Sequence, residues 1–267
     1  PTPIQEKAIP FILENSQDLI ALAQTGTGKT AAFGLPLLNM LDTTSKQVQA
    51  FILCPTRELC LQITRDLMSF ATQMRGVNIV AVYGGASISN QLRDLRRGAN
   101  IVVGTPGRVN DFVKRGNLNV SNVKWLVLDE ADEMLNMGFF DDVQTILSKF
   151  DSKRQLMMFS ATMPKQIVRL INNSFNKPEM VQIANKSLSN DDIEQKFFVV
   201  REKHFKEALA RLIDDAPDMY GIVFCRTKIE TKSVADDLKK RGHVAEVLHG
   251  DMGQSERDHA MENFKAK

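Results

Sequence analysis

The sequence predicts an α/β protein built around a doubly wound parallel sheet, and two observations support this prediction. Short apolar runs rich in Val, Ile, Leu and Phe alternate with longer amphipathic segments, as expected where strands alternate with helices. Several runs are apolar at every position, which is typical of parallel strands that helices cover on both faces. A chain of 267 residues has room for two such domains.

Six strand candidates lie in the first part of the chain, and segments with helical periodicity separate them. The strands are predicted at residues 18–23, 49–54, 77–82, 100–104, 123–128 and 155–159. The clearest helices are predicted at residues 58–74, 87–97 and 139–150. The only tryptophan, Trp125, falls within the fifth strand, so we expect it to pack in the core rather than to stack on a base.

The alternation breaks at Asn185–Asp192, where polar and turn-forming residues follow one another. Such a stretch is typical of a linker. We therefore predict a first lobe at residues 1–184, a linker at 185–193 and a smaller second lobe at 194–267. Within the second lobe, strands are predicted at 196–200, 220–225 and 244–249, and helices at 203–214, 228–241 and 254–265.

Composition excludes several classes of protein. No apolar run approaches the ~18 residues that a membrane helix needs, and the first residues do not resemble a signal peptide, so we expect a cytoplasmic protein. The three cysteines have no CxxC spacing, which argues against a zinc site or a disulfide framework. The net charge of +2 neither requires nor excludes a nucleic-acid partner.

A glycine-rich segment follows the first predicted strand and opens a helix, which is the setting of a phosphate-binding loop. Its glycines would let backbone N–H groups converge on phosphate oxygens at the positive end of the helix. Its lysine would neutralise the phosphates, and its last threonine would ligate Mg²⁺. An ordinary turn is the alternative. The predicted nucleotide contacts are Ala23, Gln24, Thr25, Gly26, Thr27, Gly28, Lys29 and Thr30.

Two carboxylates, Asp129 and Glu130, directly follow the fifth predicted strand and so lie at the sheet edge where ligands bind in doubly wound folds. Asp129 would hold Mg²⁺ with Thr30, and Glu130 would orient or deprotonate the attacking water. Acidic residues also suit an ordinary helix start. Because hydrolysis needs both a phosphate loop and an acidic pair, their combination favours Lys29, Asp129 and Glu130 as catalytic residues.

Three other strand ends carry residues suited to a phosphate backbone. Arginines and a helix start at two of them would bind phosphates, and paired glycines at the third would let a sugar–phosphate chain come close. Such contacts read the shape of a strand rather than its sequence. Ordinary strand–helix turns are the alternative. The residues are Pro55, Thr56 and Arg57; Gly84 and Gly85; and Thr105, Pro106, Gly107 and Arg108.

Together these motifs resemble the DEAD-box family of RNA helicases. Asp129-Glu130-Ala131-Asp132 spells the family name, residues 23–30 match its A-x-T-G-[ST]-G-K-T loop, and Thr2–Gln5 resembles its Q motif, in which Gln5 would recognise adenine. The three strand ends match its RNA-backbone motifs. Ser160-Ala161-Thr162 resembles the motif that links hydrolysis to strand separation, so the resemblance implies coupling roles for Asp132, Ser160 and Thr162.

In the second lobe, residues 223–227 resemble the fourth motif of the family, and residues 249–257 resemble an RNA-contact segment. The RNA contacts implied there are Arg226, Gly250, Gln254 and Arg257. The resemblance also implies a RecA-like first lobe, a second, incomplete RecA-like α/β lobe, ATP and Mg²⁺ as cofactors, and single-stranded RNA as a partner that is bound independently of its sequence. It implies that ATP hydrolysis is coupled to duplex unwinding or to remodelling of RNA–protein complexes.

The fifth and sixth motifs of the family do not occur within these 267 residues. The sixth supplies arginines to the γ-phosphate, and an arginine finger is worth about 10³–10⁵ in turnover. We therefore expect this chain to bind nucleotide but to hydrolyse ATP poorly and to unwind little. Two other functions stay open: a phosphate-loop ATPase that acts on DNA or protein, and a non-catalytic module that binds nucleotide, RNA or a partner protein.

Overall fold

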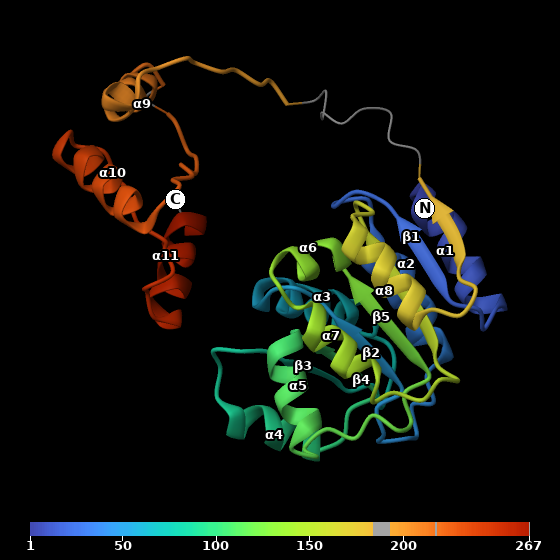
Figure 1. The fold of residues 1–267 in the computed structure, drawn as a ribbon. Helices are drawn as coiled ribbons and strands as arrows, with labels where there is room; N and C mark the ends of the chain where they lie inside the picture. The colour runs from blue at the N-terminus through green and yellow to red at the C-terminus, as the bar shows by residue number, and fades with distance from the viewer. Residues whose placement is uncertain (184–192, 217, 267) are drawn as a thin grey trace. The chain divides into compact units, whose positions relative to one another are not determined.

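The structure is a computed structural model that describes residues 1–183, 193–216 and 218–266. It divides into two compact units, residues 1–188 and 189–267, and each is described by itself (Figure 1). The predicted linker at 185–193 lies almost wholly outside the described residues, so the predicted domain boundaries stay predictions. Within the described part of the chain, every helix is too short or too polar to span a bilayer.

The first unit contains a seven-stranded sheet in the order β3-β4-β2-β5-β6-β1-β7, and every neighbouring pair is parallel. The strands are β1 Leu19–Leu22, β2 Ala50–Leu53, β3 Ile79–Val82, β4 Ile101–Gly104, β5 Trp125–Asp129, β6 Gln155–Ser160 and β7 Glu179–Gln182. The predicted α/β fold with a parallel, doubly wound sheet is confirmed for this unit.

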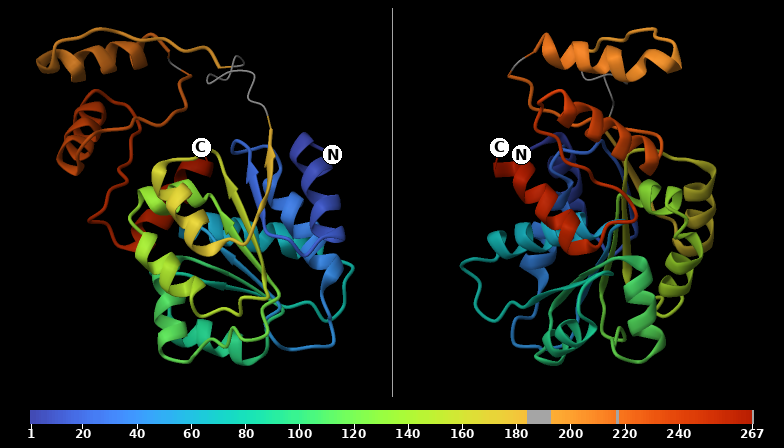
Figure 2. Two further views of the ribbon diagram at one scale, coloured as in Figure 1. Left: turned by 45° about the vertical axis from the view of Figure 1, so that its right-hand side comes forward. Right: turned by 90° about the vertical axis from the view of Figure 1, so that its left-hand side faces the viewer.

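Helices cover both faces of the sheet, as Figure 2 shows in its right-hand view. One face carries α1 Pro3–Glu14, α2 Lys29–Met40 and α3 Arg57–Phe70. The other carries α4 Ile88–Arg96, α5 Pro106–Lys114, α6 Ala131–Asn136, α7 Phe140–Leu147 and α8 Lys165–Ser174. Side chains alternate between the two cores, so Ile20 packs on one face while Leu19 and Ala21 pack on the other.

The strand register brings the carboxyl ends together at one edge of the sheet. Leu22 of β1 pairs with Ser160 of β6, and Asp129 of β5 pairs with Phe159. On the other side of β5, Leu53 of β2 pairs with Gly104 of β4. Every predicted site residue of the first unit that follows a strand therefore lies at this carboxyl edge.

All six strands predicted for this unit are present, and the helices predicted at 58–74, 87–97 and 139–150 correspond to α3, α4 and α7. The seventh strand, β7, was not predicted. It pairs with β1 at the border of the sheet, and three of its four residues are exposed. An edge strand with one neighbour does not need the continuous apolar run that identified the others.

The second unit contains the three predicted helices but not the three predicted strands. Its helices are the short η1 Glu202–His204, α9 Phe205–Asp214, α10 Lys228–Lys240 and α11 Gln254–Ala266. Among described residues 193–216 and 218–266, the strands predicted at 196–200, 220–225 and 244–249 are wrong, because no residue there joins a ladder.

Exposure explains why these runs do not form strands. Phe197, Val199 and Phe224 are 89–92% exposed, whereas a parallel strand is covered on both faces. The described residues of this unit bury four apolar side chains, those of Ala210, Val234, Ala235 and Leu238. The apolar runs match the sequence pattern of a buried strand, but among residues 193–216 and 218–266 these four buried side chains are too few to cover the faces of a sheet.

Candidate functional site

The segment between β1 and α2 has the backbone of a phosphate-binding loop. Gly26 and Gly28 adopt positive φ angles of 78° and 86°, which glycine reaches without steric cost. Gly28 precedes the first turn of α2, so the free N–H groups of that turn face the loop. The side chain of Lys29 is buried, and its Nζ donates to the Ala23 carbonyl at 3.2 Å. Because the Lys29 amine lies against the loop, it is positioned to bind a triphosphate at the start of α2.

Residues at the start of the chain close over this loop. The side chain of Gln5 donates from Nε2 to the Gly28 carbonyl at 3.1 Å and accepts at Oε1 from the Thr2 backbone N–H at 3.0 Å. A Cβ atom on Gly28 would lie 2.4 Å from Gln5 Nε2. Gln5 therefore contacts the phosphate loop directly, while its predicted recognition of adenine stays a prediction.

Asp129 lies at the end of β5, with 3% of its surface exposed. Burial, opposed by the charge of Lys29, raises the pKa of Asp129 from 3.8 to about 6. Strand β6 pairs with both β1 and β5, with Leu22 opposite Ser160 and Asp129 opposite Phe159, so the phosphate loop and the acidic motif follow strand ends that lie close together. Because burial disfavours the ionised form of this carboxylate, a cation bound beside it would strongly stabilise the ionised form.

Glu130 adopts a left-handed conformation, with φ 48° and ψ 50°. Among the described residues, only Glu130 and Lys177 combine a positive φ with a side chain other than hydrogen. Such a conformation costs of order 1–2 kcal/mol, and strain of this kind gathers at functional sites. The turn leaves Glu130 between β5 and α6, with its N–H donating to Asp129 Oδ1 at 3.1 Å.

Asp132 and the segment after β6 are joined by hydrogen bonds. Asp132 Oδ2 accepts from the Thr162 backbone N–H at 2.9 Å and from the Thr162 hydroxyl at 2.7 Å, and the Ser160 hydroxyl donates to the Thr162 carbonyl at 2.9 Å. Burial alone would raise the pKa of Asp132, but the hydrogen bonds that its carboxylate accepts, above all from Thr162, outweigh burial and lower that pKa. The three residues predicted to couple the sites are therefore in direct contact.

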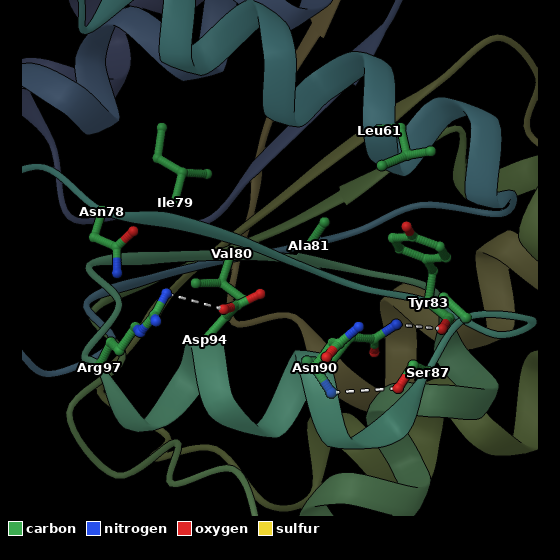
Figure 3. Close-up of a pocket in the computed structure, with 12 residues that line it drawn as sticks. Leu61, Asn78, Ile79, Val80, Ala81, Tyr83, Ser87, Asn90, Asp94 and Arg97 are labelled. Atoms are coloured by element: carbon green, nitrogen blue, oxygen red, sulfur yellow. Dashed lines mark hydrogen bonds and ion pairs between the residues drawn. The ribbon is translucent and has the colours of Figure 1, made fainter.

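The loops after β2, β3 and β4 form a connected group on the other half of the edge. The Arg57 guanidinium lies 5.3 Å from the centre of the Tyr83 ring. The Tyr83 carbonyl accepts from Gln91 Nε2 at 2.9 Å (Figure 3), and Arg108 Nη1 donates to Gln91 Oε1 at 3.3 Å and to the Ala86 carbonyl at 3.2 Å. The two predicted arginines thus both contact the segment that follows β3, Arg57 at Tyr83 and Arg108 at Ala86.

Open space surrounds two glycines of this group. A Cβ atom on Gly84 or on Gly107 would meet no atom within 4 Å. Gly85 has a positive φ of 80°, so the backbone itself requires glycine there. Thr56 caps α3 by accepting from the Leu59 N–H at 3.2 Å, whereas Thr105 makes no such side-chain bond at the start of α5. Packing among the described residues therefore gives no reason for glycine at 84 and 107.

Two residues of this group, Tyr83 and Gln91, were not predicted. Tyr83 stands between the β3 strand and Gly84, and an aromatic residue beside paired glycines was a usable signal. Gln91 lies inside α4, and nothing in its sequence context marks it. Its role appears only when α4 packs beside β3 and brings its amide to the Tyr83 carbonyl.

The predicted residues of the second unit are only partly brought together. Arg257 Nη2 donates to the Gly250 carbonyl at 2.8 Å. Arg226 forms an exposed ion pair with Glu202 at 3.2 Å, and Gln254 bonds within its own helix. These contacts are local, and the RNA-binding roles of all four residues stay predictions.

The first unit has the RecA-like α/β fold, with its sequence motifs gathered along one edge of a parallel sheet. Residues 2–170 match the family model described as DEAD/DEAH box helicase, and residues 204–267 match the helicase conserved C-terminal domain. The chain therefore belongs to the DEAD/DEAH box helicase family, and the predicted family resemblance is confirmed.

Several known proteins are similar to this chain. It is 48% identical over 265 residues to the ATP-dependent RNA helicase CshA of Listeria monocytogenes, covering 99% of this chain and 50% of that protein. It is 45% identical to the ATP-dependent RNA helicase DeaD of Escherichia coli K12, covering 99% and 42%. The chain thus spans about half the length of these curated relatives.

A solved structure is also similar. It is the crystal structure of a DEAD box protein from the hyperthermophile Methanococcus jannaschii, with a TM-score of 0.66 and 41% identity, and the match covers 100% of this chain and 71% of that one.

Proposed function

We propose that this chain is the nucleotide- and RNA-binding core of an ATP-dependent RNA helicase. The observation that supports the proposal most is the division of the carboxyl edge. The phosphate loop, the acidic motif and the Ser160–Thr162 segment follow β1, β5 and β6, whereas the three backbone-binding segments follow β2, β3 and β4. This strand order supports a division of the edge into a proposed nucleotide half and a neighbouring proposed RNA half.

In the nucleotide half, backbone N–H groups of Gly26–Thr30 would bind phosphate oxygens at the start of α2, and Lys29 would move from the Ala23 carbonyl to the phosphates. Thr30 and Asp129 provide the oxygen donors that Mg²⁺ prefers, and Mg²⁺ is commonly held by one or two protein groups together with phosphates and water. Bound Mg²⁺ would supply charge neutralisation at the phosphates. Gln5, which is bonded to the Gly28 carbonyl, would recognise the adenine base.

The catalytic role proposed for Glu130 is to orient the attacking water. The left-handed backbone of Glu130 turns the chain sharply at the end of β5. The γ-phosphate would lie beside this turn if Lys29 binds the phosphates and Asp129 binds Mg²⁺ as proposed. Asp132 would pass a change at this turn to the segment after β6, because its carboxylate holds Thr162 through two hydrogen bonds.

In the RNA half, the proposed contacts are to the backbone of a single strand. Arg57 and Arg108 would pair with phosphates, and the free N–H groups at the start of α5 would donate hydrogen bonds to another phosphate. Gly84 and Gly107 would let the strand lie against the main chain. Nothing in this set reads base edges, so we propose binding that is independent of sequence. We further propose Arg226, Gly250, Gln254 and Arg257 as RNA contacts of the second unit, and a cytoplasmic location.

Nucleotide-dependent RNA binding tests the proposal. Fluorescence anisotropy would follow a labelled single-stranded RNA with the chain as given, in the presence and absence of Mg²⁺ and a non-hydrolysable ATP analogue. We expect the analogue to tighten RNA binding by the unsubstituted chain and to have no effect on Lys29→Ala. An RNA affinity of the unsubstituted chain that does not change when the analogue and Mg²⁺ are added would refute a shared nucleotide and RNA function.

A further inference from the structure

Gln91 of α4 is a buried polar residue to which the proposed function gives no role. It is 6% exposed, and both ends of its amide are bonded. Nε2 donates to the Tyr83 carbonyl at 2.9 Å, and Oε1 accepts from Arg108 Nη1 at 3.3 Å. A donor at one end and an acceptor at the other fix the orientation of the amide. The Gln91 side chain therefore links the end of β3 to the arginine at the start of α5.

Arg108 completes a closed set of hydrogen bonds around the segment that follows β3. Its Nη1 atom carries two hydrogens and donates both to Gln91 Oε1 and, at 3.2 Å, to the Ala86 carbonyl. Gln91 thus holds the segment where it begins, at Tyr83, and Arg108 holds it where it ends, at Ala86. The Phe112 ring lies beside the same guanidinium, with 5.7 Å between its centre and the central carbon of Arg108.

These contacts decide which edge of the Arg108 guanidinium is left for a ligand. A guanidinium has five N–H groups, and the two of Nη1 are used inside the protein. Within residues 1–183, 193–216 and 218–266, no hydrogen bond engages Nε or Nη2 of Arg108, and the residue is only half-buried. Nε and Nη2 share one edge of the group and can donate two parallel hydrogen bonds to a phosphate. With Nη1 held by Gln91, Arg108 would present this edge to the strand.

Packing does little to hold the segment after β3 in place. A cavity of about 340 Å³ lies beside it, and its lining includes Tyr83, Ala86 and Gln91 (Figure 3). Gly84 and Gly85 are exposed, and a Cβ atom on Gly84 would meet no atom of the described residues within 4 Å. Paired glycines also leave the backbone unusually free. The hydrogen bonds of Gln91 and Arg108 are therefore the contacts that fix the segment.

We propose, on the basis of the proposed RNA-binding function, that Gln91 is a positioning residue that holds Arg108 with its Nε and Nη2 atoms free for a phosphate of the bound strand. Gln91 would not touch the strand, because it is buried and both ends of its amide are bonded. Without Gln91, the Arg108 side chain would keep only the Ala86 carbonyl and would adopt more rotamers, which RNA binding would then have to restrict. Gln91 acts through Arg108, so its effect on RNA affinity should vanish when Arg108 is replaced.

The test compares the unsubstituted chain with Gln91→Met, Arg108→Ala and the double variant. Methionine is unbranched and close in size to glutamine, so Gln91→Met keeps the packing of α4 and removes both hydrogen bonds. Fluorescence anisotropy would measure the affinity for a labelled oligouridine with Mg²⁺ and a non-hydrolysable ATP analogue. Arg108→Ala should weaken binding about tenfold, as loss of a hydrogen bond to a charged group does, and Gln91→Met at least about threefold. In the Arg108→Ala background, Gln91→Met should have no further effect.

Salt dependence separates a positioning role from a packing role. On a single strand, each phosphate contact contributes about 0.7 to the slope of log affinity against log salt concentration. Gln91→Met changes no charge, yet it should make this slope shallower, as Arg108→Ala does. Gln91→Ala, which removes the same two hydrogen bonds, should reproduce both effects. Gln166→Met, at an exposed glutamine of α8, is the matched control and should change neither affinity nor slope.

The RNA-binding function and the role of Gln91 would be contradicted by different results. RNA affinity of Arg108→Ala equal to that of the unsubstituted chain would refute the proposed RNA contact of Arg108, and the role of Gln91 with it. If Arg108→Ala does weaken binding, the role of Gln91 alone is overturned by unchanged affinity of Gln91→Met, by an unchanged salt slope or by losses that add in the double variant. Nucleotide affinity, measured by calorimetry, should be the same in all of these proteins; a Gln91→Met variant that loses it would show that Gln91 supports the whole fold rather than Arg108.

Discussion

Replacing Asp129 by Asn should stabilise the nucleotide-free chain at neutral pH. The folded state holds the Asp129 side chain where ionisation is unfavourable, since burial raises its pKa from 3.8 to about 6. At about 1.36 kcal/mol per pH unit, that rise corresponds to about 3 kcal/mol. Asparagine has nearly the same shape as the protonated acid and still offers an oxygen to the Glu130 N–H, so the variant should avoid this cost.

Because the pKa of Asp129 is raised on folding, the stability difference between Asp129→Asn and the parent depends on pH. Below pH 3.8, Asp129 is protonated in both the folded and the unfolded states, so aspartate and asparagine should give similar stability. Between pH 3.8 and about 6, the unfolded state loses its proton while the folded state keeps it, and the unsubstituted chain loses stability as pH rises. The advantage of Asp129→Asn should therefore grow across this window and level off above it, at about 3 kcal/mol.

Urea unfolding, followed by Trp125 emission in EDTA at several pH values and constant ionic strength, would measure this difference. Comparing variant with parent at each pH cancels the titration of the other carboxylates. Glu133→Gln is the matched control, because Glu133 is an exposed carboxylate of α6, and its effect should stay within about 0.5 kcal/mol. A difference that does not change with pH, or a variant less stable than the parent at pH 7.5, would refute the reasoning.

Three further variants test neighbouring parts of the account. Gly28→Ala should lower nucleotide affinity and should cost at least about 1–2 kcal/mol of stability in urea unfolding. The cause is that the new side chain would occupy a position with a positive φ and would clash with Gln5. Unchanged nucleotide affinity would show that the loop does not bind phosphate. Gly107→Ala should leave stability unchanged or raise it by up to about 1 kcal/mol, since it adds a helix-forming residue in open space, yet it should weaken RNA binding in anisotropy; RNA affinity equal to that of the parent would place the strand elsewhere. Thr162→Val should lose the 2.7 Å hydroxyl bond to Asp132 and about 1.5–3 kcal/mol of stability. A non-hydrolysable ATP analogue should also tighten its RNA binding less than in the parent, while its nucleotide affinity is kept; equal tightening in the two proteins would argue against coupling.

The sequence predicted strand positions best where burial on both faces makes every residue of a strand apolar. Strands such as β2 and β4 are apolar at every position because helices cover both of their faces, and they could be located to within a residue or two. The positions of Gly26–Thr30 and Asp129 directly after β1 and at the end of β5 were also predictable, because the apolar runs before them locate the strand ends.

Other features depend on contacts that no local pattern encodes. The polar strand β7 exists because β1 offers it a free edge. The apolar runs at Phe197 and Phe224 resemble buried strands, but these residues are 89% exposed and no ladder forms. The left-handed turn of Glu130, the bond from Gln5 to the phosphate loop and the bonds of Gln91 to Tyr83 and Arg108 all arise from segments that meet only in the folded chain.

The magnesium dependence of nucleotide affinity tests the central claim most directly, because it asks whether the phosphate loop and the acidic motif hold one ligand between them. Calorimetric titration of a non-hydrolysable ATP analogue, with and without Mg²⁺, would be carried out on the chain as given and on Asp129→Asn. We predict that Mg²⁺ tightens binding by the unsubstituted chain at least about tenfold, or about 1.4 kcal/mol, and that this enhancement is lost in Asp129→Asn. An enhancement of equal size in both proteins would contradict the account.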